Sequence, residues 1–149
     1  MTVMYKTLVR KVSGGTGHTH LTSGTLFNWT GTIEIVSISG RITTDTEAAA
    51  NTCKLSITPD AQTPVDICGT KDLDHLHAGT MLHIDGTLAN AMIGVDGVGV
   101  AVSQATKITA TCITSGTITV TYGTAAKDGG ITWELSWLPL SQSATATAA

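Results

Sequence analysis

Residues 131–137 read Ile131-Thr-Trp-Glu-Leu-Ser-Trp137 and end two residues before Pro139. Four apolar side chains alternate here with a threonine, a glutamate and a serine. In an extended strand, alternate residues point to opposite faces, so both tryptophans lie on the apolar face. Two indoles on one face must be buried in a core or against a partner. The stretch therefore predicts a half-buried β-strand.

Alternation with a period of two recurs along the chain, whereas no helical period lasts beyond about two turns. The apolar run from Ile33 to Ile38 changes phase between residues 35 and 36, which indicates a β-bulge. About nine or ten short strands separated by turns predict an all-β fold, a single β-sandwich or jelly-roll domain over residues 1–140. The strands are expected at 3–12, 25–29, 31–43, 52–58, 64–69, 79–85, 97–103, 107–122 (a hairpin) and 131–137.

Three local features complete this prediction. In the 107–122 hairpin, a three-residue loop ending at a left-handed Gly116 would place Cys112 opposite Ile118 and leave a ladder of threonines facing solvent. The pattern from Thr44 to Asn51 resembles a capping box and predicts one short helical turn. Residues 141–149 contain only Ser, Gln, Ala and Thr, and we expect a flexible or extended C-terminal tail there.

Composition excludes several classes of protein. Charged residues make up 13% of the chain, about half the usual ~25%, and 28 threonines favour strands. A net charge of −3 with scattered cations argues against nucleic acid and anionic membranes as partners. No apolar run approaches the about 18 residues of a membrane span. The first ten residues lack a secretory signal pattern, so we expect a reducing cytoplasm, with Cys53, Cys68 and Cys112 reduced.

The segment from Asp72 to Asp85 contains the most tempting chemical pattern. His75 and His77 would share one side of a strand, and a hairpin loop at residues 78–80 would bring His83 opposite His75. Three imidazoles could then approach one metal ion. The alternative is that these are surface or interface histidines beside an acidic turn. Because the spacing specifies no fourth ligand, we predict no metal, cofactor or catalytic residue.

The C-terminus resembles a known class of protein. Gly129-Gly-Ile-Thr-Trp-Glu-Leu-Ser-Trp-Leu-Pro-Leu140, followed by a tail of small residues, is similar to the ending of many small virion proteins of tailed bacteriophages. The resemblance covers about the last 20 residues and implies a head decoration (cement) protein or a related head or tail protein. Such proteins are often jelly-roll or β-sandwich trimers, which implies self-association and contact with the major capsid protein or another virion protein.

We therefore expect a non-enzymatic virion structural protein that occupies the host cytoplasm before assembly. A tail-tip or host-recognition module is the nearest variant. A carbohydrate-binding β-sandwich is a rival from another class, although six aromatic residues are few for a sugar-binding surface. A cupin-like metal enzyme that uses His75, His77 and His83 is the remaining alternative.

Overall fold

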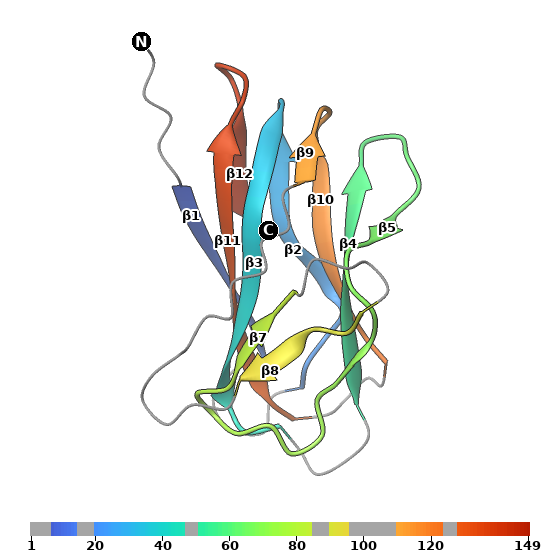
Figure 1. Ribbon diagram of the computed structural model, residues 1–149, viewed down its shortest axis with the longest axis vertical. Helices are drawn as coiled ribbons and strands as arrows, with labels where there is room; N and C mark the ends of the chain where they lie inside the picture. The colour runs from blue at the N-terminus through green and yellow to red at the C-terminus, as the bar shows by residue number, and fades with distance from the viewer. Residues whose placement is uncertain (1–6, 15–19, 47–50, 85–89, 96–109, 124–127) are drawn as a thin grey trace.

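Two antiparallel sheets face each other in the computed structural model, which describes residues 7–14, 20–46, 51–84, 90–95, 110–123 and 128–149 (Figure 1). The first sheet has the order β1-β11-β3-β7-β8, with β9 also paired to β3. Its strands are β1 (Thr7–Gly14), β11 (Gly130–Pro139), β3 (Ile33–Thr44), β7 (Met81–His83), β8 (Ile93–Val95) and β9 (Ala110–Cys112).

The second sheet has the order β12-β2-β10-β4-β5, with β6 also paired to β4. Its strands are β12 (Thr145–Ala148), β2 (Gly24–Thr30), β10 (Gly116–Tyr122), β4 (Thr52–Pro59), β5 (Val65–Asp66) and β6 (Lys71–Asp72). The prediction of an all-β sandwich is confirmed. The described residues contain twelve strands rather than nine or ten, because two- and three-residue strands line the sheet edges.

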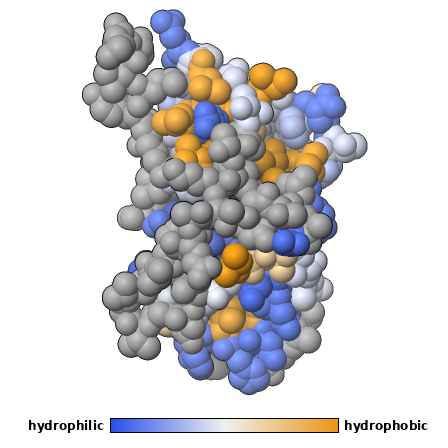
Figure 2. Space-filling view, in the orientation of Figure 1, coloured by the Kyte–Doolittle hydropathy of each residue, from blue (hydrophilic) through white to orange (hydrophobic). Residues whose placement is uncertain are grey.

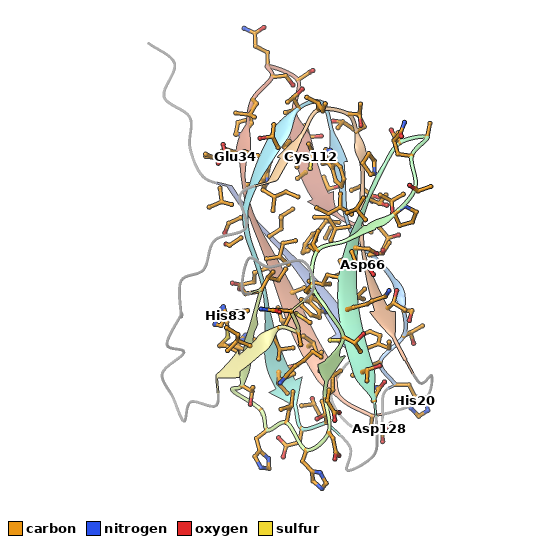
Figure 3. The ribbon with its side chains drawn as sticks, turned by 45° about the vertical axis from the view of Figure 1, so that its right-hand side comes forward. His20, Glu34, Asp66, His83, Cys112 and Asp128 are labelled. Carbon is orange, nitrogen blue, oxygen red and sulfur yellow. The ribbon has the colours of Figure 1, made fainter. Side chains whose placement is uncertain are left out.

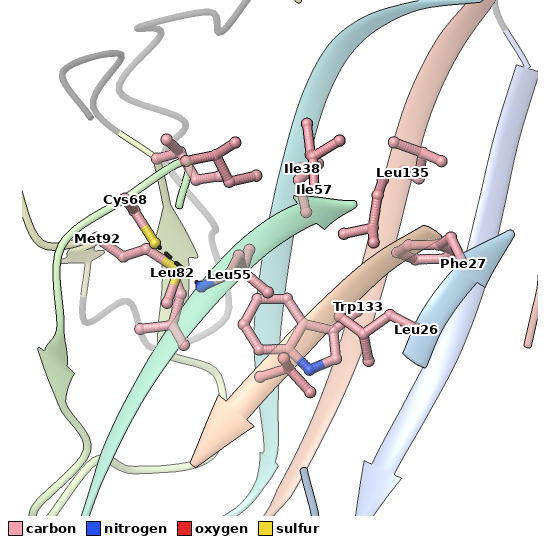
Figure 4. Close-up of a cluster of buried hydrophobic side chains, with 14 of the residues drawn as sticks. Leu26, Phe27, Ile38, Leu55, Ile57, Cys68, Leu82, Met92, Trp133 and Leu135 are labelled. Carbon is pink, nitrogen blue, oxygen red and sulfur yellow. Dashed lines mark hydrogen bonds between the residues drawn. The ribbon is translucent and has the colours of Figure 1, made fainter. Parts of the chain in front are cut away.

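Strand β11 is central to the core, as its alternating pattern predicts. Ile131, Trp133 and Leu135 have no exposed surface, and Trp137 is 5% exposed. Trp133 lies opposite Gly40 of β3, where an added Cβ would come within 2.8 Å of the indole ring. Figure 4 shows Trp133 and Leu135 among side chains of both sheets, including Phe27 of β2 and Leu55 of β4.

The predicted bulge in β3 is confirmed. Ile35 lies opposite Trp137 and Ser37 lies opposite Ser136, so Val36 is the extra residue. Because the extra residue shifts the phase, Ile35 and Ile38 both reach the core. A second register shift lies between β10 and β2 and leaves Leu26 as the extra residue, so Leu26 and Phe27 are both buried.

The prediction of a hairpin at residues 107–122 is wrong. β9 pairs with β3 in the first sheet, whereas β10 lies between β2 and β4 in the second sheet. Cys112 therefore lies opposite Ile33 rather than Ile118. The backbone of Gly116 is also not in the left-handed conformation, since the described glycines with positive φ are Gly31, Gly79 and Gly129. Local alternation cannot distinguish a hairpin from two strands that cross between sheets.

The predicted helical turn from Thr44 to Asn51 is not confirmed. Thr44 is the last residue of β3, and no helix occurs in the described residues, although residues 47–50 lie outside them. The predicted strand at 97–103 also lies outside the described residues. Within the 141–149 segment, residues 145–148 form β12, which pairs with β2 of the same chain. No helix long and apolar enough to cross a membrane occurs in the described ranges.

Candidate interaction surface

The three histidines of the 72–85 segment lie in different environments. His75 has a positive φ of 54° and its Nδ1 lies 2.8 Å from Asp74, while His77 Nδ1 lies 3.3 Å from Asp45. His83 is on β7, opposite Ser39 of β3 (Figure 3). The structure therefore does not bring the histidines together. Within the described ranges, no group of three His, Cys, Asp or Glu side chains could hold a metal ion.

The loop that carries His77 is held by hydrogen bonds to residues after β3. The Ala78 amide donates to Asp45 Oδ1 at 2.7 Å, and this bond, together with His77, holds the pKa of Asp45 below its ordinary value. Thr46 is buried; its hydroxyl accepts from the Leu76 amide at 2.8 Å and donates to the Leu73 carbonyl. These contacts give the segment a structural role at this end of the sandwich.

The opposite end of the sandwich carries three turns, which we call the apex: residues 30–33, 113–116 and 139–145 (Figure 1). Each turn joins a strand of one sheet to a strand of the other. The indole Nε1 of Trp29 donates to the Thr114 carbonyl at 2.7 Å, so a core side chain supports the second turn from beneath. Trp29 is only 2% exposed, so the packed core holds the indole ring in place.

Side chains and backbone connect the three turns to one another. Thr32 is the centre of these contacts: its amide donates to Ser141 Oγ at 3.1 Å, its hydroxyl to the Ile113 carbonyl at 3.4 Å, and its carbonyl accepts from Leu140 at 2.9 Å. The Gly31 amide donates to Ser115 Oγ at 3.2 Å. The Ser115 carbonyl accepts from Asp60 of the β4–β5 loop at 2.8 Å. The apex backbone is therefore fixed from several directions.

This fixed backbone presents apolar side chains to solvent. Ile113 is 77% exposed and Leu140 is 40% exposed, and Thr32 lies between them through the bonds just described. No residue of the three turns is charged. Figure 2 shows apolar surface at this end of the molecule. An uncharged, pre-ordered surface with exposed aliphatic side chains suits contact with another protein.

Sequence reasoning missed the apex because it placed residues 112–118 in a hairpin. Ile113 follows the inward-facing Cys112, so alternation alone would have predicted an outward-facing isoleucine. The exposure of Ile113 could therefore have been predicted from the sequence. Its proximity to Leu140 could not, because only the tertiary structure brings residues 113 and 140 to the same end.

The outer face of the second sheet is rich in hydroxyl groups. One row across β12, β2, β10 and β4 consists of three threonines and one asparagine: Thr147, Asn28, Thr117 and Thr58. Neighbouring hydroxyls bond to each other, with Ser56 and Thr119 at 2.9 Å and Thr30 and Thr145 at 2.7 Å. The threonines of β10 thus lie on an outer face, as expected, but Thr111 lies on β9 in the other sheet, and Thr109 is outside the described residues.

A scan of the chain against protein-family models finds no match, and a search of curated proteins finds no significant relative.

Proposed function

We propose that this chain is a non-enzymatic structural protein of a tailed-phage virion, namely a head decoration protein that binds the major capsid protein through the apex. The observation that carries the proposal is the pair of exposed aliphatic side chains, Ile113 and Leu140, on a hydrogen-bonded backbone. The protein would occupy the host cytoplasm before assembly and the virion afterwards. This proposal combines the apex with the C-terminal resemblance.

The strand order supports a capsid-associated role by analogy. Eight of the strands have the orders β1-β11-β3-β7 and β2-β10-β4-β5 within the two sheets. From this order we infer a jelly roll, an architecture used by viral capsid domains, lectins and cupins. Because fold alone does not define function, the choice among these classes rests on the surface.

The aromatic residues disfavour the lectin alternative. Sugar-binding surfaces need exposed rings, but the aromatic side chains whose burial the structure describes all lie in the core: Phe27, Trp29, Tyr122, Trp133 and Trp137. The separated histidines likewise give a cupin-like enzyme no ligand set within those ranges. Contact between proteins needs neither feature.

The size of the apolar apex predicts how binding is achieved. A stable interface buries about 800 Å² on each partner, and two partly exposed aliphatic residues supply a small part of that area. Single contacts would be weak, and several linked contacts would be much stronger. We therefore propose a homotrimer that presents three copies of the apex to a repeating capsid surface.

Co-sedimentation with purified phage heads tests the proposal. The heads come from a lysate of the phage whose genome encodes the chain, and the variants are wild type, I113S/L140S and V65S. Val65 is 50% exposed on β5, outside the three turns, so V65S controls for the loss of an exposed apolar residue. Burying an aliphatic side chain contributes about 1.5–3 kcal/mol, so the double variant should bind at least tenfold more weakly per site.

Three results would contradict the proposal. The first is wild-type protein that stays in the supernatant with its own phage heads. The second is a folded double variant that binds as well as wild type. The third, against the trimer alone, is a monomer near 15.3 kDa by size-exclusion chromatography with light scattering at every concentration. Circular dichroism of each variant verifies that it is folded.

A further inference from the structure

Two of the three cysteines lie side by side along β4. Cys53 is on β4 and Cys68 follows β5, and each is 1% exposed. The Leu55 amide donates to the Cys68 sulfur at 3.3 Å, shown by the dashed line in Figure 4. Cys53 and Leu55 are two residues apart on the same strand, so their side chains share one face. The Cys68 sulfur therefore lies beside the part of β4 that carries Cys53.

The pairing of β4 places Cys68 between two residues that lie beside Cys53 and its neighbours. Ser56 is paired with Asp66, the Ile67 amide donates to the Leu55 carbonyl at 3.0 Å, and Cys53 is paired with Lys71. Residues 68–70 therefore bulge beside Lys54, and the bond from the Leu55 amide holds the Cys68 sulfur against β4. Disulfides join Cα atoms that are about 4.4–6.8 Å apart, a range that includes the spacing of about 4.8 Å between neighbouring strands.

Electrostatics also indicates that Cys53 and Cys68 are near each other. Burial raises the pKa of the Cys53 thiol, and the charge of Cys68 raises it further. The pKa of Cys112 is raised by burial alone. Cys112 lies in the other sheet, opposite Ile33. The third cysteine is therefore a natural control for the first two.

We propose that Cys53 and Cys68 form a disulfide when the protein meets a dialkyl disulfide such as oxidised glutathione. One cysteine thiolate attacks the glutathione disulfide, forms a mixed disulfide and releases one glutathione thiolate. The second cysteine then attacks the protein sulfur of the mixed disulfide and releases the other glutathione. The two thiol protons pass to the departing glutathione molecules, so the protein is oxidised by two electrons and the reagent is reduced.

The edge of the sheet offers the reagent a route to the buried thiols. β5 and β6, which flank Cys68 in sequence, are two residues long, and three of their four residues are exposed. Opening this short edge would expose both sulfurs without unfolding the longer strands. The raised pKa of Cys53 predicts that the reaction speeds up with increasing pH, since the thiolate is the nucleophile. The inference is independent of the virion proposal.

Trypsin provides a direct test on the wild-type chain. Cleavage after Arg41, Lys54 and Lys71 places Cys53 in peptide 42–54 and Cys68 in peptide 55–71, and Cys112 lies in peptide 108–127. The folded protein is treated with oxidised glutathione, blocked with iodoacetamide, digested without reductant and analysed by mass spectrometry. We expect a linked 42–54/55–71 pair with the mass of two hydrogens lost. Protein oxidised in guanidinium gives the reference distribution of all three pairings.

Variants and stability complete the test. C112S should form the same link as wild type, and C53S and C68S should not form it. Closing a loop of about 15 residues should raise the melting temperature by about 6–12 °C in wild type and C112S. If the folded wild-type chain gives no 42–54/55–71 link, or links peptide 108–127 equally often, the inference is wrong. Because that readout uses wild type, it holds even if a variant folds poorly.

Discussion

Replacing Gly116 by alanine should destabilise the protein by overpacking. An added Cβ would lie 2.7 Å from two ring atoms of Trp29 and close to the Thr58 carbonyl oxygen. Carbon atoms prefer separations of about 3.5–4.0 Å, so the ring or the strand would have to move by almost 1 Å. Trp29 is held by its bond to Thr114, and Thr58 belongs to the paired strand β4. Overpacking of this kind costs about 1–3 kcal/mol.

Gly24 supplies a matched control on the neighbouring strand. A Cβ added at Gly24 meets nothing within 4 Å, so G24A should change the free energy of unfolding by about 0.5 kcal/mol or less. Urea denaturation of wild type, G116A and G24A measures the difference, and the melting temperature of G116A should fall by about 2–4 °C per kcal/mol. Equal stability of G116A and G24A would show that the contact between Gly116 and Trp29 is not tight.

Two further predictions concern pH and the C-terminal strand. Burial lowers the pKa of His83 from its ordinary value of 6.5, so the unfolded state binds more protons below that pH. Stability should therefore decline as the pH falls below about 6.5, and H83Q should show a shallower decline in urea titrations; an identical slope would exclude His83 as a source. Deleting residues 141–149 removes β12, including the Ala149 amide bond to the Leu26 carbonyl at 3.0 Å, and exposes the edge of β2. We expect a lower melting temperature and concentration-dependent association by light scattering, and an unchanged monodisperse profile would contradict this.

The sequence predicted what depends on local alternation. Eight of the nine predicted segments overlap observed strands, and the inward face of β11 and the bulge at Val36 follow from the residue pattern. Alternation specifies which side chains share a face, and burial of the two tryptophans then requires a second layer. The order of strands within each sheet has no such local signal. The failure at 107–122 illustrates this, because Cys112 and Ile118 alternate correctly with their neighbours yet belong to different sheets.

The candidate surface was harder to predict for the same reason. Thr32, Ile113 and Leu140 are far apart in sequence and meet only because turns that connect the two sheets gather at one end. The histidine pattern shows the opposite error. A hairpin at residues 78–80 would have opposed His75 and His83, but the Gly79 amide bonds to the Ile42 carbonyl and the segment docks on β3. Sequence spacing implies a site only when the backbone between the residues is known.

The contacts beneath the apex connect the stability of the core with the proposed docking. Association costs less when the contacting groups are already ordered, so an exposed isoleucine is most useful on a backbone that cannot move. Here a buried indole fixes the Thr114 carbonyl, and Thr32 fixes both neighbouring turns. Gly116 allows the indole to lie close enough to make its bond. A substitution in the core at this point should thus weaken docking as well as folding, whereas a substitution of Ile113 itself should weaken docking alone.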